Sequence, residues 1–233
     1  KKKTYCLGGA ANVMRNIVSL GGEALAFGII GDQHNGKHLL NLIKDGGIRY
    51  ENIFVDKNYL TIEKQRIIAE SQQLARVDYE DKETIPDYLH EAIVERIIKL
   101  IKEDKLDAVI FEDYAKGLIT SEMMSAILFE ANKKGIISSL DPHPSRKLKF
   151  KNITLVTPNQ SEAFALAGIY NKELINPPIE DKYLISVAEI LGNDWEAEQL
   201  LITLGAKGMA LFGKNSEPIH IPTRAKEVFD VTG

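Results

Sequence analysis

The chain has 233 residues, of which 44% are hydrophobic, and its formal net charge is −4. A chain of this length buries about 70–75% of its unfolded surface, and the weak negative charge offers no field for nucleic acid or an anionic membrane. No run reaches the roughly 18–20 apolar residues that span a bilayer, and the single cysteine excludes an internal disulfide. We therefore expect a soluble, cytoplasmic protein with neither a nucleic-acid nor a membrane partner.

The first third of the chain mixes helical and strand patterns. Residues 10–20 carry apolar side chains at helical spacing before two glycines, which predicts a helix. Residues 24–30 predict a short buried strand, and residues 39–43 supply the apolar face of a second helix. Residues 60–80 alternate between apolar and polar side chains without a helix cap, which predicts antiparallel strands.

From residue 86 onward the pattern becomes regular. The expected helices cover residues 86–101, 123–131, 162–167 and 183–191, and the expected strands cover residues 107–111, 136–140, 153–156 and 200–204. A short β-meander is expected at residues 208–212, 219–221 and 228–229. Strands that alternate with helices predict βαβ units and a mostly parallel sheet covered by helices. We expect one α/β domain over residues 1–233, with a small antiparallel lid at about residues 59–80.

Polar residues follow several of these predicted strands. They are Glu112 with Asp113, Asp141, residues 157–159 and Gly205. Because ligands of open α/β sheets bind at the carboxyl ends of the strands, these residues are candidates for the site.

A glycine-rich segment opens the first predicted helix. Gly8 and Gly9 let a backbone approach a ligand closely, and the start of the helix offers free N–H groups. Asn12 carries donors and an acceptor, which suits the hydroxyl groups of a sugar. A plain glycine turn before a helix is the alternative interpretation.

The predicted lid has one polar face. Gln72, Arg76, Asp78 and Glu80 alternate with apolar residues, and upstream Lys64 and Arg66 share a face. An arginine fork matches phosphate oxygens, so Arg66 and Arg76 are candidates for reading an anionic substrate. A simply solvated strand face is the alternative.

Two further segments suit a nucleotide. Asn159 precedes a predicted helix with Glu162 three residues on, which indicates a capping box or, alternatively, oxygens that face phosphates and Mg²⁺. Thr203, Gly205 and Gly208 form a strand and a turn in which glycines permit positive φ or a close ligand, although a plain hairpin has the same pattern.

The order of these segments is more specific than any of them alone. The glycine loop, the alternating strands, Asn-x-x-Glu, Thr-x-Gly-x-x-Gly and a final Asp-x-Thr-Gly make the chain resemble the ribokinase-like (PfkB) carbohydrate kinases throughout. Residues 72–80, 113–117 and 222–233 look most like the kinase domain of ADP-heptose synthesis enzymes.

The resemblance implies a ribokinase-like α/β fold and a specific reaction. The enzyme would use ATP and Mg²⁺ to phosphorylate D-glycero-β-D-manno-heptose 7-phosphate at O1, which gives the 1,7-bisphosphate. This step belongs to the synthesis of ADP-heptose and the lipopolysaccharide core. The resemblance also allows a monovalent cation as a further cofactor and a homodimer as the assembly. A kinase for another sugar or sugar phosphate, and a non-catalytic sugar- or nucleotide-binding relative, are the alternatives.

The resemblance also assigns roles to residues. The candidate substrate-binding residues are Gly8, Gly9, Asn12, Arg66, Gln72, Arg76 and Asp113. The candidate nucleotide-binding residues are Asn159, Glu162, Thr203, Gly205 and Gly208, with Glu162 near Mg²⁺ through water. Asp230, Thr232 and Gly233 would begin the anion hole.

The chain departs from the family pattern in three respects. The family's first strand, with a sugar-binding Asp, would precede the first residue given, and His143 stands where the family has Lys. The family continues after its Thr-Gly with Ala-Gly-Asp, whose Asp is the catalytic base. The 233 residues by themselves are therefore expected to be catalytically silent.

Overall fold

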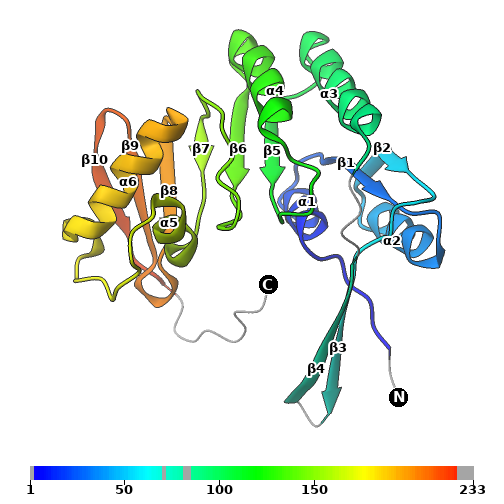
Figure 1. The fold of residues 1–233 in the computed structure, drawn as a ribbon, viewed down its shortest axis with the longest axis horizontal. Helices are drawn as coiled ribbons and strands as arrows, with labels where there is room; N and C mark the ends of the chain where they lie inside the picture. The colour runs from blue at the N-terminus through cyan, green and yellow to red at the C-terminus, as the bar shows by residue number, and fades with distance from the viewer. Residues whose placement is uncertain (1–2, 70–71, 81–84, 225–233) are drawn as a thin grey trace. The chain divides into compact units, whose positions relative to one another are not determined.

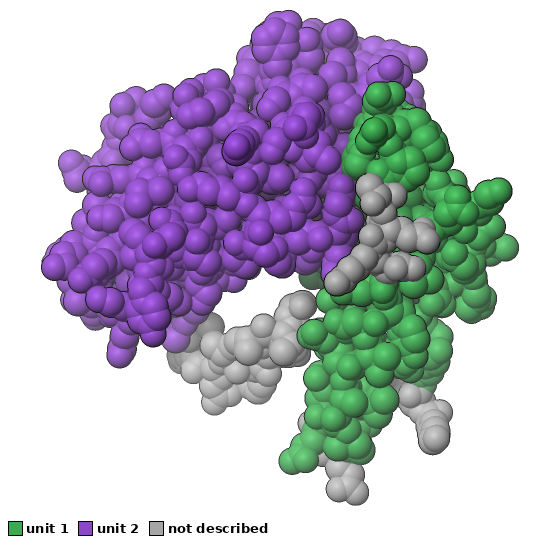
Figure 2. Space-filling model, viewed as in Figure 1, with its two compact units in different colours: residues 1–93, 233 green, residues 94–232 purple. Residues whose placement is uncertain are grey.

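A computed structural model describes residues 3–69, 72–80 and 85–224. These residues divide into two compact units, the first reaching Ile93 and the second beginning at Val94 (Figure 2). The expectation of a single kinase domain over residues 1–233 stays a prediction.

The first unit is built around a small parallel βαβ arrangement. Its elements are α1 (Ala10–Ser19), β1 (Leu25–Ile30), α2 (His34–Asp45) and β2 (Arg49–Val55), and β1 pairs in parallel with β2 (Figure 1). Its core consists of small and aliphatic side chains, with buried Leu7, Ala24, Ala26, Ile43 and Ile48 packed against residues that include Met14, Ile17 and Leu39. The helices predicted near residues 10–20 and 39–43 are thus confirmed.

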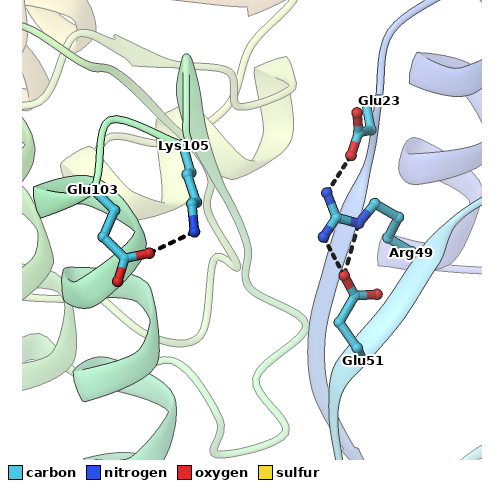
Figure 3. Close-up of polar contacts among 5 residues, drawn as sticks. All are labelled: Glu23, Arg49, Glu51, Glu103 and Lys105. Atoms are coloured by element: carbon cyan, nitrogen blue, oxygen red, sulfur yellow. Dashed lines mark hydrogen bonds and ion pairs between the residues drawn. The ribbon is translucent and has the colours of Figure 1, made fainter.

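Arg49 ties the starts of β1 and β2 together at the surface. Its Nη1 lies 2.5 Å from Oε1 of Glu23, and Nε and Nη2 both contact Oε1 of Glu51 (Figure 3). In the second unit, Lys105 lies 2.7 Å from Glu103 in a simpler pair, also drawn in Figure 3. Such exposed pairs contribute only about 0–1 kcal/mol each, so they adjust the fold and do not determine it.

The predicted antiparallel strands are present in the first unit. β3 (Glu63–Ala69) and β4 (Gln72–Tyr79) form a two-stranded sheet (Figure 1). Every residue of β4 is exposed. Ile67 pairs with Ala75 and Ile68 with Gln73, so the pairing of the two strands skips one residue of β4. The strict alternation of faces predicted along β4 is therefore interrupted near its start, between Gln73 and Ala75. In the regular part, Arg66 stands opposite Arg76.

The second unit contains a six-stranded sheet in the order β10-β9-β8-β7-β6-β5 (Figure 1). Its strands are β5 (Ala108–Glu112), β6 (Ile137–Asp141), β7 (Leu155–Val156), β8 (Gln199–Thr203), β9 (Met209–Gly213) and β10 (Ser216–Ile221). The strands β5 to β8 pair in parallel, whereas β9 and β10 are antiparallel. The predicted mostly parallel sheet is confirmed, and residues 228–229 of the expected meander lie outside the described residues.

Helices alternate with these strands as the sequence predicts. They are α3 (Asp87–Lys102), which contains the boundary between the units, α4 (Ser121–Lys134), α5 (Gln160–Ala167) and α6 (Lys182–Trp195), with short 3-10 turns η1 (Pro178–Glu180) and η2 (Gly205–Lys207). The side chain of Thr120 caps α4 and that of Asp181 caps α6. No helix in the described part of the chain is long and apolar enough to cross a membrane.

Trp195 anchors the core of the second unit at the end of α6. The residue is 1% exposed, and its ring stacks on Phe150 with centroids 5.6 Å apart and planes 5° from parallel. Its Nε1 donates to the carbonyl of Leu148 at 2.9 Å, so the one polar atom of the side chain is satisfied in the interior.

Candidate nucleotide and substrate sites

The candidate nucleotide-binding residues meet at the carboxyl ends of β7 and β8. Asn159 follows β7 and forms a parallel bridge with Thr203, the last residue of β8. The N–H of Thr203 donates to the carbonyl of Pro158 at 3.1 Å. Two segments that are more than forty positions apart in the sequence are thus held side by side.

Asn159 and Glu162 form the predicted capping box at the start of α5. Oδ1 of Asn159 accepts from the N–H of Glu162 at 3.0 Å, and Oε2 of Glu162 accepts from the N–H of Asn159 at 2.8 Å. The cap fixes both side chains at the carboxyl edge of the sheet. It confirms the structural interpretation and leaves the binding role of both residues a prediction.

The turn after β8 requires glycine for two different reasons. Gly205 has φ +58° and open space where a side chain would stand. At Gly208, with φ +87°, an added Cβ would lie 2.1 Å from the carbonyl oxygen of Ile221. Gly208 therefore serves the packing of the turn, whereas at Gly205 only the positive φ favours glycine, and a binding role of Gly205 stays a prediction.

Two carboxyl groups stand side by side at the ends of β5 and β6. Glu112 and Asp141 are register partners on these parallel strands. Burial raises the pKa of Glu112 to about 7, and the charge of Asp141 adds to the effect although Tyr114 opposes it by a hydrogen bond. Burial and the charge of Glu162 raise the pKa of Asp141 to about 6, and burial with Glu112 raises that of Tyr114 to about 12. The pKa values of both carboxyl groups are therefore shifted toward neutral pH.

Asp113, a predicted substrate-binding residue, is almost enclosed, with a side chain that is 2% exposed. Its Oδ1 accepts from the N–H of Ala115 at 2.9 Å and lies 3.7 Å from Nη1 of Arg146. Arg146 also donates to the carbonyl of Ile119 at 2.8 Å. Oδ2 of Asp113 and Oε2 of Glu112 are buried and find no hydrogen-bond partner among the described residues. Two acceptors are thus left available at this edge.

His143, at the position where the resemblance leads us to expect a lysine, contacts its own loop. Its Nδ1 lies 2.8 Å from Oγ of Ser145 and accepts from the N–H of Ser145 at 3.2 Å. The side chain acts locally as a turn residue.

The glycine-rich segment lies in the first unit. Gly9 has φ +54° and precedes α1 without a side-chain cap, so glycine fits the backbone there. A Cβ added at Gly8 would meet no other atom within 4 Å. Oδ1 of Asn12 accepts from Nη2 of Arg15 at 3.0 Å in an exposed contact. The segment thus presents a glycine turn and a polar amide at a helix start, as predicted.

The lid carries a cluster of charges on its regular part. Lys64 stands opposite Asp78, and Arg66 opposite Arg76. Nε of Arg76 lies 3.0 Å from Oδ1 of Asp78, and Nζ of Lys64 lies 3.5 Å from its Oδ2. Lys64 and Arg76 share this carboxylate, and Arg66 stands opposite Arg76, so three cations lie on one face of the lid in an arrangement that suits an anion.

Some candidate residues lie outside the described part of the chain, and others were missed from sequence. Asp230, Thr232 and Gly233 are not among the described residues. Arg146 lies in no motif, and Gln160 and Lys207 occupy unspecified positions of the Asn-x-x-Glu and Thr-x-Gly-x-x-Gly motifs. Their contacts join separate segments of the chain, so sequence patterns did not indicate them. The described residues contain no group of three or more His, Cys, Asp or Glu side chains that could hold a metal ion.

Known proteins are similar to this chain along most of its length. Residues 2–233 match the pfkB family of carbohydrate kinases. The chain is 36% identical over 233 residues to "Bifunctional protein HldE" of Wolinella succinogenes and 35% identical to the protein of the same name from Helicobacter acinonychis. It spans 47% and 48% of those relatives, about half their length.

Solved structures share the fold. Phosphofructokinase-2 from Escherichia coli in complex with fructose-6-phosphate superimposes with a TM-score of 0.69 at 22% identity, over 95% of this chain and 72% of that one. Ribokinase of Arabidopsis thaliana complexed with ribose and ATP gives a TM-score of 0.70 at 18% identity, over 99% and 71%. The predicted ribokinase-like fold is confirmed, and the chain belongs to the pfkB family of carbohydrate kinases.

Proposed function

We propose that this chain is the kinase part of an enzyme that uses ATP to phosphorylate D-glycero-β-D-manno-heptose 7-phosphate at O1, in the synthesis of ADP-heptose and the lipopolysaccharide core. The observation that carries the proposal is the similarity of the whole chain, at 34–36% identity, to several bifunctional HldE proteins. The heptose-kinase motifs at residues 72–80 and 113–117 support the same substrate.

The nucleotide side of the proposed site uses the carboxyl edge of the second unit. Asn159 and Thr203 are bridged there, and Gly205 leaves open space beside them. The start of α5 adds N–H groups that favour phosphate oxygens. This arrangement suits a nucleoside triphosphate.

Mg²⁺ fits this site as a companion of the nucleotide. Glu162 has one carboxylate oxygen in the cap, and its second oxygen would accept from a water bound to Mg²⁺. Mg²⁺ keeps several waters and relies on substrate phosphates, which agrees with the lack of a dedicated cluster of ligands among the described residues. The metal would offset negative charge on the transferred phosphoryl group. A monovalent cation belongs to the same proposal.

The substrate side of the proposal uses hydrogen-bond acceptors and cations. Oδ2 of Asp113 is buried without a partner among the described residues, and a sugar hydroxyl would supply the missing donor. Gly8, Gly9 and Asn12 would bind the sugar, and Arg66 and Arg76 would receive its 7-phosphate. Direct in-line transfer then moves the γ-phosphoryl group to O1, whose proton passes to a base of the enzyme.

A coupled assay of ADP release by the full-length protein tests the proposal. The acceptors are heptose 7-phosphate, the unphosphorylated heptose, ribose and fructose 6-phosphate, each with Mg-ATP. We expect kcat/KM for heptose 7-phosphate to exceed the others by about 100-fold, since charged hydrogen bonds to a phosphate contribute about 1.5–3 kcal/mol each. Phosphorus NMR should locate the new phosphate at O1.

Other outcomes select the alternatives. A preference for fructose 6-phosphate or ribose would assign the chain to another sugar kinase of the same family. Tight binding of sugar and nucleotide without any turnover of the full-length protein would indicate a non-catalytic member.

A further inference from the structure

A solvent-open pocket of about 480 Å³ lies in the second unit beside the proposed nucleotide residues. It is lined by Gln160, Asn171, Lys172, Glu173, Leu174, Leu204, Ala206 and Lys207. Gln160 directly follows Asn159, and three of the other lining residues lie within the turn between Thr203 and Gly208. The pocket therefore shares its walls with the proposed nucleotide site, although the segment 171–174 belongs to no motif.

One anchor of the segment 171–174 comes from the first residue of α5. Nε2 of Gln160 donates to Oδ1 of Asn171 at 2.8 Å and to the carbonyl of Lys172 at 2.9 Å. Nδ2 of Asn171 in turn donates to Oγ of Ser161 at 3.1 Å. The segment is thus tied to the first turn of α5, where the capping box also stands.

The second anchor comes from the turn after β8. Nζ of Lys207 donates to the carbonyl of Leu174 at 2.5 Å. The backbone of Lys207 is itself fixed, because its carbonyl accepts from Nε2 of His220 at 2.8 Å. The N–H of the next residue after the segment, Ile175, donates to Asp181, the cap of α6, at 3.1 Å. The loop is therefore held from three elements of the second unit.

We propose that Lys207 is a positioning residue for nucleotide binding, because its ammonium group holds the segment 171–174 as a wall of a pocket that receives part of the nucleotide. The inference rests on the proposed function and adds to it the segment 171–174, which belongs to no motif, and Lys207, whose position the Thr-x-Gly-x-x-Gly motif leaves unspecified. A methionine at this position would keep the apolar stem but lose the donor that reaches Leu174. An arginine would keep a cationic donor.

The hydrogen bond from Lys207 to Leu174 should increase the affinity for the nucleotide. Without it, the loop gains conformational freedom that the bound nucleotide must remove again. Because only part of the roughly 1.5–3 kcal/mol of such a charge-assisted hydrogen bond is passed on to the ligand, we expect the dissociation constant to change by about 3- to 30-fold. Because the effect acts on the nucleotide wall, it should appear in the KM for ATP before it appears in kcat.

Calorimetry on the full-length protein tests the inference with a non-hydrolysable ATP analogue and Mg²⁺, and separately with heptose 7-phosphate. Lys207→Met should raise the Kd of the nucleotide about 3- to 30-fold and leave that of the sugar phosphate unchanged. Lys207→Arg should restore most of the affinity. Lys214→Met is the matched control, since Lys214 lies in the turn at the far end of β9, and it should bind as the unaltered protein does.

A second variant checks that both anchors act on the same loop. Gln160→Leu removes the donors to Asn171 and Lys172. If both side chains hold one segment, the double variant with Lys207→Met should lose less affinity than the product of the single losses.

Three results would overturn the inference. Lys207→Met could bind the nucleotide as tightly as the unaltered protein. It could instead weaken both ligands equally while Lys207→Arg fails to restore them, which would make the lysine a general stabiliser of the fold. If the unaltered protein binds no nucleotide, the proposed function itself fails, and that result is distinct from the other two.

Discussion

Asn12 offers a test of sugar recognition at the scale of a single residue. Asn12→Ala removes the donors and the acceptor that stand three positions after Gly9 at the start of α1. We expect sugar affinity in the full-length protein to fall by about 1–3 kcal/mol, the cost of one or two hydrogen bonds to a neutral ligand. Nucleotide affinity should stay unchanged, and calorimetry measures both.

A matched control comes from the same helix. Asn16→Ala makes the identical change one turn farther from the glycine segment and should leave both affinities alone. Unchanged sugar binding in a folded Asn12→Ala variant would remove Asn12 from the site.

Because of Glu112, the stability of the folded protein should decrease as the pH rises. Burial, with Asp141 beside it, raises its pKa from an ordinary 4.5 to about 7, so the folded state holds a proton that the unfolded state releases between those values. This contribution to stability is complete below the ordinary pKa and is lost as the pH rises through 7. Glu112→Gln should therefore stabilise the protein by about 1–2 kcal/mol at pH 8 and hardly at all at pH 4, after allowance for solvent screening.

Thermal melts at the two pH values measure this difference. Glu103→Gln is a control of opposite kind, because the hydrogen bond from Lys105 outweighs burial and lowers the pKa of Glu103. That variant should gain no stability at pH 8. An equal gain for Glu112→Gln at both pH values would contradict the assigned titration.

At the scale of an element, Asn159 has two proposed functions, which are to cap α5 and to bind the nucleotide, and two variants separate them. Asn159→Asp keeps an oxygen that accepts from the N–H of Glu162, so the stability of α5 should be preserved. The added negative charge should repel nucleotide phosphates and raise the Kd of Mg-ATP by about tenfold, which is about 1.4 kcal/mol. Asn159→Ala should instead lose about 1 kcal/mol of stability with the cap.

Melting temperatures and nucleotide titrations on both variants decide the matter. If Asn159→Asp binds the nucleotide as tightly as the unaltered protein does, Asn159 only caps the helix and does not bind the nucleotide.

The lid strands should bind the phosphate group of the substrate through Arg66 and Arg76. Arg66 and Arg76 face each other across β3 and β4, and like charges in that position destabilise a sheet unless an anion lies between them. Arg76→Ala should lower kcat/KM for heptose 7-phosphate by about 10–100-fold and leave the unphosphorylated sugar unaffected. Arg49→Ala, an exposed arginine of the same unit engaged with Glu23 and Glu51, is the control. An equal loss for both sugars would exclude a phosphate-reading role.

The elements differ in how well the sequence predicts them. The cap of α5 was predictable, because a capping box is a local pattern of four residues. β2 was not, because its first three residues, Arg49 to Glu51, are polar and exposed, and the strand depends on pairing with β1. The pairing of Glu112 with Asp141 was likewise hidden, since a register between strands is set by tertiary structure.

At the scale of the whole molecule, the sequence predicts the class of fold, whereas the division into compact units has no counterpart in its pattern. Regular alternation after residue 86 indicates the parallel sheet, and that sheet is present in the second unit. The division near Ile93 falls inside α3, whose apolar periodicity runs on without a break. A boundary within a continuous helix leaves no turn or linker pattern for sequence reasoning to find.

Trp195 is the only tryptophan of the chain, and its burial against Phe150 makes it a built-in optical probe of the second unit. Acrylamide should quench its fluorescence poorly in the native protein, because 1% of the residue is exposed. During denaturation, its emission should shift to the red only when the second unit opens, whereas far-ultraviolet dichroism follows the helices of both units. Mg-ATP should move the emission midpoint to higher urea, and an emission change that precedes the loss of dichroism would show that the second unit opens first.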